Sequence, residues 1–326
     1  MTDDNIVDDG LAASIRDAAL ASGYDDCGII SLDDMDGFKD RIKERIRNSP
    51  TSAVVYRTVG DLTGIKERFP WARAVVICTY WIGRYRFPKD LQGRYAKSFL
   101  LSPENPVNPD AHSRLGILER WFTDNGIRYE GGEQFGHLSI GPLRHAAMMA
   151  GLGIIRKNNF FYTEKGSFVN LTGYVIDREC TLYRESGLKP CPESCDLCRK
   201  ACKTKALKGP YSMSPLRCIS FWTTFGKGMC PPYLRKKTFE EWICGCDACQ
   251  DACPHNRKHD WNIGEDYPHL TELTERLQPE NLLEHPDDRI VETISQLSAH
   301  HLDPKDAKTV MRCAKRSLSN RAAVED

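Results

Sequence analysis

The alternation of apolar and polar residues predicts helices and strands in turn over residues 1–177. Leu11, Ile15 and Ala18 recur at the spacing of one helix face, and Gly23 is a residue of the kind that ends a helix. Short runs of apolar, β-branched and aromatic residues predict buried strands. These runs are residues 27–30, 72–81 and 168–176.

Two further helices are predicted in the same region. Apolar residues recur at helical spacing over 115–122. Pro142 is suited to open a second helix, which would end near Gly151 or Gly153. Helices and strands in this order favour a layered α/β or α+β domain, and we expect an α+β protein.

Composition divides the chain into three parts. Residues 1–177 carry the alternating elements, residues 178–260 carry most of the cysteines, and residues 261–326 are polar with helical spacing. Apart from two cysteine motifs, the sequence contains no internal repeat and no low-complexity tract. We therefore expect a layered domain, a cysteine-rich domain and a short helical C-terminal part.

Charge and hydropathy restrict the expected partners. The chain has 45 Lys and Arg against 45 Asp and Glu, so it offers no bulk attraction to nucleic acid or to an anionic membrane. The N-terminal stretch MTDDNIVDDG is acidic and lacks an apolar run, which argues against a secretory signal. No stretch approaches the roughly 18 apolar residues of a membrane span. We expect a cytoplasmic protein with no membrane partner.

Fourteen of the 326 residues are cysteines, and their distribution indicates a metal centre. Disulfides are not expected in a reducing compartment at this chain length. Eight cysteines form two runs, and the second run includes GCDACQDACPHN at residues 245–256. Six others are scattered, and we interpret Cys27 and Cys78 as small core residues. The six are Cys27, Cys78, Cys180, Cys230, Cys244 and Cys313.

The spacing of the eight cysteines favours iron–sulfur clusters over zinc. A structural zinc ion is held in a closed tetrahedron, and eight cysteines could hold two such ions. However, C-x2-C-x3-C-P is the tail of the two-cluster ferredoxin run, in which the last cysteine of each run ligates the other cluster. Crossed ligation assigns Cys191, Cys195, Cys198 and Cys253 to one 4Fe–4S cluster, and Cys202, Cys218, Cys246 and Cys249 to the second.

Two such clusters pass single electrons and need an acceptor. The first domain lacks the G-x-G-x-x-G fingerprint of a dinucleotide site, because GLGIIRKN at residues 151–158 has only two of the glycines and follows a predicted helix. The electrons therefore go to a partner protein or to another redox centre in the first domain.

Several segments together resemble the epoxyqueuosine reductase family, which is related to the cobalamin-dependent reductive dehalogenases. The strongest are AGLGIIRKNNFFYTEKGSFVNLTGYVID at residues 150–177 and the cysteine motifs with RCISF and GCDACQDACPHN. Upstream, ALASGYDDCGI, FPWARAVVICTYW and GRYAK are similar to family stretches in the same order. The resemblance covers most of residues 10–260 and fades in the C-terminal part.

The resemblance implies a nitroreductase-like α/β domain that holds cobalamin, with the two clusters delivering electrons to the cobalt. A strongly reducing cobalt state needs a donor of matching low potential, which an iron–sulfur pair supplies. Glycines without a Cβ would let the backbone approach the corrin ring, and polar side chains would bind its periphery. The implied cofactor-binding residues are Gly151, Gly153, Lys157, Asn158, Gly166 and Ser167.

The proton donor is where the sequence departs from the family. The family carries a D-S-x-P-x-x-E segment whose aspartate is implied as the donor, and here the segment is SIGPLRH, with Ser139 in the aspartate position. A serine hydroxyl is too weak an acid to replace a carboxylic acid. Candidate donors in its place are Tyr95, His137 and His145, since histidine titrates near neutral pH and tyrosine can act beside a reducing metal.

Three functions remain open from the sequence. The first is a cobalamin-dependent iron–sulfur reductase of an unidentified small-molecule substrate. The second is an epoxyqueuosine reductase acting on tRNA, and the third is an electron-transfer protein that reduces a partner such as a corrinoid protein. Each needs a low-potential electron donor such as a ferredoxin or flavodoxin. The basic runs at 233–237 and 311–321 suit either an acidic donor of this kind or RNA.

Overall fold

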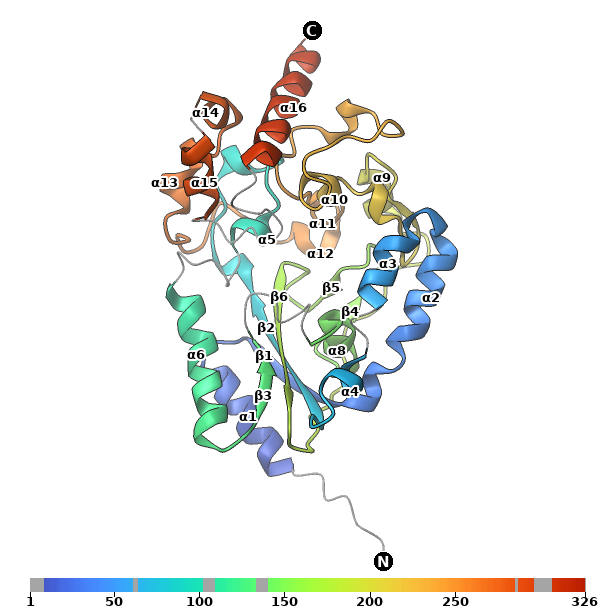
Figure 1. Cartoon of the computed structure of the whole chain (residues 1–326), viewed down its shortest axis with the longest axis vertical. Coiled ribbons are helices and arrows are strands. Elements are labelled where there is room, and N and C mark those ends of the chain that lie inside the picture. Colours follow the sequence, from blue (N-terminus) through green and yellow to red (C-terminus); the bar gives the residue numbers. More distant parts are fainter. Residues whose placement is uncertain are drawn as a thin grey trace, which may run out of the picture.

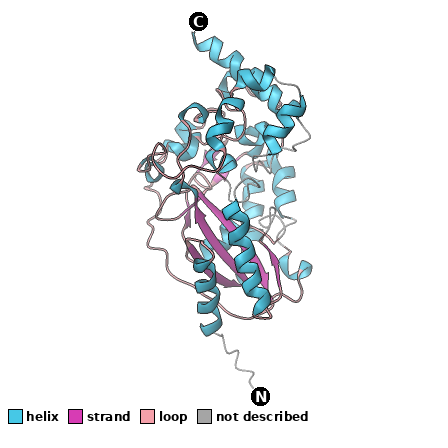
Figure 2. Ribbon diagram, turned by 90° about the vertical axis from the view of Figure 1, so that its left-hand side faces the viewer, coloured by secondary structure: helices cyan, strands magenta, loops and turns pink. Residues whose placement is uncertain are grey.

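The computed structural model has a four-stranded antiparallel sheet at the centre of its first part (Figures 1 and 2). It describes residues 9–60, 64–101, 109–132, 140–284, 287–295 and 307–325. The strand order in the sheet is β1-β2-β6-β3. Because every pairing is antiparallel, the α+β prediction is confirmed. The strands are β1 (Asp26–Ser31), β2 (Ala74–Trp81), β6 (Val169–Ile176) and β3 (Tyr129–Gly131).

The sheet separates two apolar cores because side chains alternate along each strand. On β2, Val76 and Cys78 enter the first core, whereas Val75 and Ile77 enter the second. Cys27 of β1 lies opposite Cys78 in the register and is also buried in the first core. The interpretation of these two cysteines as core residues is therefore confirmed.

Helices cover both faces of the sheet (Figure 1). α1 (Asp9–Ala21) and α6 (Pro109–Asp124) pack on the first core through residues such as Ile15 and Phe122. α8 (Leu143–Met149) packs on the second core. These three helices confirm the helices predicted from the apolar spacing and from Pro142.

A helical hairpin that the sequence analysis did not predict links the first part to the cysteine-rich part. It consists of α2 (Phe38–Asn48) and α3 (Ala53–Gly60), and the single-turn helix α4 (Ile65–Arg68) follows. The Ser52 hydroxyl between α2 and α3 lies 2.9 Å from the Ser214 hydroxyl in the cysteine-rich part.

The cysteine-rich part consists of short elements. No helix described between 178 and 260 exceeds five residues, so regular backbone hydrogen bonding orders little of it. The helices are α9 (Leu197–Ala201), α10 (Ile219–Thr223), α11 (Ala248–Asp251) and α12 (Pro254–Arg257). The strands β7 (Leu207–Gly209) and β8 (Ser212–Met213) form one two-stranded sheet, and β4 (Ile154–Ile155) and β5 (Phe161–Tyr162) form another just upstream.

Helices form the C-terminal part, as predicted. Its residue Val310 shares one apolar core with Phe122 of the first part and Ile243 of the second, so the three parts pack as one body. Among the described helices, none combines the length and the apolar character that crossing a bilayer requires. The helices are α13 (Leu270–Arg276), α14 (Pro279–Glu284), α15 (Asp287–Ser295) and α16 (Ala307–Glu325), and α5 (Lys97–Leu100) lies beside them.

Candidate functional site

Four cysteines from two distant segments border one small cavity, and we call them the first sulfur set. Cys191 and Cys195 precede α9, Cys198 lies within it, and Cys253 is the N-cap residue of α12. All four line the same cavity, together with Tyr162 and neighbouring residues. The fold therefore brings together the four cysteines that crossed ligation assigns to one cluster.

A second sulfur set is formed by Cys202, Cys218, Cys246 and Cys249. Burial raises the pKa of the Cys218 thiol to about 11, and repulsion from Cys202 acts in the same direction. Burial also raises the pKa values of Cys246 and Cys249 well above the ordinary range, and repulsion from Cys218 adds to both. Four thiolates this close together need the positive charge of bound metal to coexist.

The arrangement fits 4Fe–4S clusters better than zinc. In a zinc site four sulfurs lie about 2.3 Å from one ion and so crowd together. Among the described residues, no three His, Cys, Asp or Glu side chains are grouped to hold a single metal ion. A 4Fe–4S cluster binds one thiolate at each of four irons, and the crossed ligation of two such clusters combines cysteines of both runs in each set.

Lys157 fixes the loop that carries the first sulfur set. Its side chain is buried, and the ammonium donates hydrogen bonds to the carbonyl oxygens of Pro192, Glu193 and Cys195 at 2.6, 2.7 and 3.1 Å. Hydrogen bonds from a charged donor are stronger than neutral ones. Lys157 was predicted to bind a cofactor directly, but in this structure its three donors point to the cluster loop.

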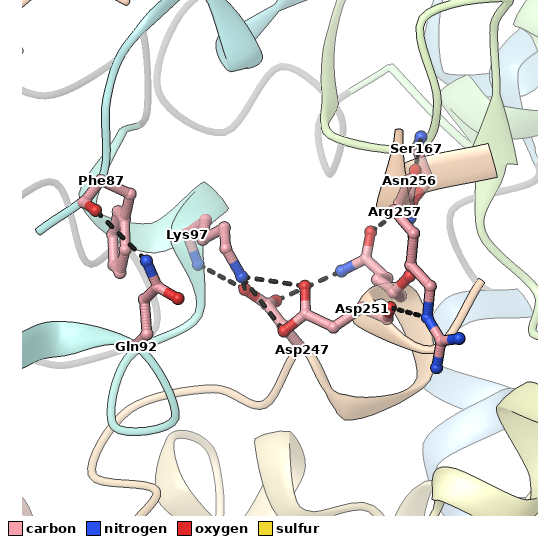
Figure 3. Close-up of polar contacts among 9 residues, drawn as sticks. Phe87, Gln92, Lys97, Ser167, Asp247, Asp251, Asn256 and Arg257 are labelled. Atoms are coloured by element: carbon pink, nitrogen blue, oxygen red, sulfur yellow. Dashed lines mark hydrogen bonds and ion pairs between the residues drawn. The ribbon is translucent and has the colours of Figure 1, made fainter. Parts of the chain in front are cut away.

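Asn158 and Ser167 connect the first part to the second cysteine run. The Asn158 amide donates to the Cys249 carbonyl at 3.3 Å. The Ser167 hydroxyl donates to Gln250 at 2.8 Å, and the Ser167 backbone N–H donates to the Asn256 side chain at 2.8 Å (Figure 3 shows Ser167 beside Asn256). These two predicted cofactor-binding residues therefore hold the loop of residues 246–256 in place.

The three predicted cofactor-binding glycines are explained by close contacts within the protein. A Cβ on Gly151, whose φ is +75°, would collide with the Arg184 carbonyl, and one on Gly153 would collide with the Tyr162 carbonyl. A Cβ on Gly166 would collide with the Asn256 side chain. Of the six residues implied as corrin contacts, Gly151 borders an open cavity, and Lys157 and Asn158 line the small cavity of the first sulfur set. Contact of these residues with cobalamin stays a prediction.

The open cavity beside Gly151 has a volume of about 410 Å³. Its walls include Thr79 and Trp81 of β2, Lys165, and residues 184–188. Along the chain, residues 184–188 lead to Cys191, and the segment that carries Gly151 leads to Lys157. The cavity therefore adjoins a chain segment that leads to the first sulfur set, although no cysteine of either set lines it.

Lys97 forms a buried ion pair next to the second sulfur set (Figure 3). Its ammonium lies 3.3 Å from Asp247, which is fully buried between Cys246 and Cys249 in the sequence, and 2.9 Å from Asp251. Burial raises the pKa of the Asp247 carboxyl to about 6, although the Lys97 ammonium opposes the rise. The rings of Phe87, Phe168 and Trp261 lie 5.1 to 5.8 Å from the same ammonium.

The predicted proton donors are not brought together. The Tyr95 hydroxyl is buried and donates to the Leu277 carbonyl at 2.8 Å. His145 is buried against the Phe38 ring, and its Nε2 lies 3.0 Å from the Asp34 carbonyl. Neither lines the open cavity. His137 and Ser139 fall outside the described residues, so a catalytic role for any of the three candidates stays a prediction.

Sequence analysis missed Lys97 as a site residue. The available signal was its place in GRYAK, one of the stretches that resemble the family. Nothing local to that stretch indicates that its lysine would meet Asp247, 150 positions further along the chain.

This chain is similar to a family of iron–sulfur domains and to several epoxyqueuosine reductases. Residues 191–256 match the 4Fe-4S double cluster binding domain. An epoxyqueuosine reductase of Cellulophaga algicola is 26% identical over 80% of this chain and 85% of its own length. That of Bacillus subtilis is 27% identical over 78% of this chain and 65% of its own length. That of Prochlorococcus marinus is 35% identical over 34% of this chain and 35% of its own length.

Solved structures show the same fold at low identity. A crystal structure of epoxyqueuosine reductase with an epoxyqueuosine-modified tRNA-Tyr stem loop covers 95% of this chain and 81% of its own, with a TM-score of 0.72 and 22% identity. The Bacillus subtilis enzyme gives a TM-score of 0.73 at 23% identity over 95% of this chain and 82% of its own. The fold of the sheet, the cysteine-rich part and the C-terminal helices is therefore shared nearly end to end.

Proposed function

The chain belongs to the epoxyqueuosine reductase family, and on that premise we propose that it reduces epoxyqueuosine in tRNA. The reaction takes two electrons and two protons, converts the epoxide to an alkene and releases the epoxide oxygen as water. The observation that supports the proposal most is the crossed convergence of the two sulfur sets beside an open cavity. The two sulfur sets would pass electrons one at a time, and the cavity would hold the group that accepts them.

The order of the relay follows from which cysteines lie near the cavity. The first sulfur set is held by Lys157 and by the chain segment that also forms a cavity wall. No cysteine of either set lines the cavity, but Cys191 of the first set follows closely on the wall formed by residues 184–188. We therefore place the second cluster as the entry point for electrons and the first as the donor to the cavity.

Cobalamin is part of the proposal through the family resemblance. Bound at the cavity beside Gly151, it would supply a cobalt centre able to accept the electrons. Of the six implied contact residues, Gly151 lines that cavity, whereas Lys157, Asn158 and Ser167 hydrogen-bond to the protein.

We propose His137 as the proton donor. It lies two residues before Ser139, the position at which the family carries its aspartate, and histidine can donate a proton near neutral pH. Tyr95 and His145 are weaker candidates because each is buried against a carbonyl oxygen away from the cavity. Replacing His137 with glutamine should slow turnover and leave iron content unchanged.

The proposal is tested by anaerobic purification followed by three measurements. Iron analysis should give about eight irons per chain for two 4Fe–4S clusters. Added cobalamin should be taken up in a one-to-one ratio with a spectrum that changes on reduction. Dithionite-driven assay on an epoxyqueuosine-containing tRNA stem loop should yield the alkene.

Two results would overturn it. Zinc in place of iron would remove the relay. Both clusters present without conversion of the stem loop would overturn tRNA as the substrate and favour an unidentified small molecule, or a partner protein if cobalamin is also not bound.

A further inference from the structure

One stretch of the chain carries a strong excess of positive charge. Residues 199–237 contain ten Lys and Arg and no Asp or Glu, although the chain as a whole is neutral. Only Lys200 and Lys203 form ion pairs within the part of the chain that the structure describes, with Asp196 and Glu240. Of the other eight, all but Arg217, which donates a hydrogen bond to the Thr204 carbonyl, are exposed.

Exposed apolar side chains lie in the same stretch. Phe225, Met229 and Tyr233 are 62%, 54% and 54% exposed, which is unusual for residues of this size. The exposed cations Lys227 and Arg235 alternate with them along the chain. We call these five residues the 225–235 face. An apolar centre with aromatic, Met and Arg side chains and a charged rim is the composition of a protein interface.

The 225–235 face is linked to the second sulfur set through aromatic contacts. The Phe225 ring lies 6.1 Å from that of Phe221, whose backbone N–H donates to the Cys218 sulfur. The Tyr233 ring lies 6.5 Å from that of Trp222, which stacks edge-on with Phe221 at 5.3 Å. A partner seated on this face therefore lies a few side chains from the cluster at which electrons enter.

We propose that the 225–235 face is the docking surface for an acidic one-electron donor protein of the flavodoxin or ferredoxin kind. The inference rests on the proposed function, because it assumes that the second cluster receives electrons. Positive charge around the face attracts a donor with carboxylates around its redox centre and speeds the encounter. RNA fits less well, because a substrate must reach the cavity and none of the five residues of the face lines it.

The test compares two reductants on one protein. Reduced flavodoxin must dock, whereas dithionite is a small molecule that reaches the clusters directly. The variant Lys227→Glu/Arg235→Glu reverses two charges of the face. The control Lys39→Glu/Arg47→Glu reverses two exposed charges on α2. Cluster bleaching is followed by anaerobic stopped flow at low and high salt.

The expected result is a loss of at least about tenfold in the rate with flavodoxin at low salt for the face variant, and no change for the control. The wild-type rate should fall as salt rises, and dithionite should reduce all proteins equally fast. Met229→Ser, which keeps the charges, should also slow reduction by flavodoxin and leave reduction by dithionite unchanged.

Three outcomes would overturn the inference. These are equal rates for face variant and wild type, equal slowing with both reductants, or weakened binding of the tRNA stem loop with the flavodoxin rate intact. The last would make the face an RNA surface. Dithionite-driven turnover of the stem loop needs no donor protein, so failure of the proposed function would be seen separately.

Discussion

The central sheet and the cysteine-rich part are ordered by different forces. In the sheet, Val76 and Ile77 on adjacent positions enter opposite apolar cores, so burial of apolar surface fixes both register and packing. In the cysteine-rich part, the helices are a turn or so long, and the buried groups include the polar side chains of Asp247 and Gln250.

This difference separates two kinds of dependence. The sheet and the helices that cover it need only apolar protein side chains, so the loss of stability on mutation should increase with the side-chain volume removed. The cysteine-rich part needs inorganic clusters and hydrogen bonds from charged groups. Replacement of a few atoms there should therefore lower iron content or stability more than the removed volume alone would.

The largest effect is expected for Cys249→Ser. A serine hydroxyl does not replace a thiolate ligand, so the second cluster should be lost, with iron content falling by about half and its EPR signal absent. Cys230→Ser in the same part, outside both sulfur sets, is the matched control and should keep full iron. Unchanged iron in Cys249→Ser would contradict the ligand assignment.

Lys97→Met should have the next largest effect, on the free energy of unfolding. Removing the ammonium leaves the fully buried Asp247 carboxylate without its partner, a loss that costs about 3–5 kcal/mol for a buried pair. Anaerobic urea unfolding measures it. Because the added Asp247→Asn change removes the unpaired charge, the double variant should regain part of the loss. No regain would show that the cost arises elsewhere.

Ile77→Ala tests the sheet in isolation. Its side chain is fully buried in the second core, so the deletion should cost about 2–5 kcal/mol in the free energy of unfolding. The iron content of the folded protein should stay at the wild-type value, in contrast to Cys249→Ser. Loss of iron from Ile77→Ala at unchanged solubility would break the separation between the two regions.

Lys157→Met should have a smaller and local effect. Three partly exposed carbonyl oxygens lose their charged donor, and a hydrogen bond to a charged group contributes at most about 1.5–3 kcal/mol here. Loss of the first cluster to an iron chelator should become faster than loss of the second. Lys189→Met, at an exposed lysine next to the same loop, is the control and should match the wild-type rate.

The smallest effect concerns pH. Burial lowers the pKa of His145 from its ordinary 6.5, with Arg41 and Arg45 adding repulsion and the Asp34 carbonyl opposing the shift. The stability due to neutral His145 should be complete above pH 6.5 and decline as pH falls toward the lowered value, because the unfolded state then binds more protons. Melting temperatures of wild type and His145→Gln across this range should converge on acidification.

Sequence alone was sufficient where the signal is local. Periodicity located α1, α6, α8 and the strands β1, β2 and β6, because each buries a face whose residues are close in the chain. Motif spacing likewise grouped Cys191, Cys195, Cys198 and Cys253, which line one cavity, whereas ligation of clusters by the eight cysteines stays a prediction.

Long-range partners were not predictable in this way. The roles of Lys157 and Asn158 depend on carbonyl oxygens 35 to 91 positions away, which leave no trace in local spacing. The missed hairpin of α2 and α3 has a similar cause, since part of what it packs against, around Ser214, lies in another part of the chain.

The clamp formed by Lys157 has a consequence for excision experiments. The stretch 191–256 looks like a self-sufficient ferredoxin, yet one of its loops is pinned from outside by Lys157 and its C-terminal helix by Ser167. Expressed alone, residues 191–256 would lose the hydrogen bonds from Lys157 and Ser167. The fragment should then fail to assemble stable clusters. The cluster-binding stretch therefore depends on residues of the first part. A transfer of this stretch into another protein should need residues 157–167 as well.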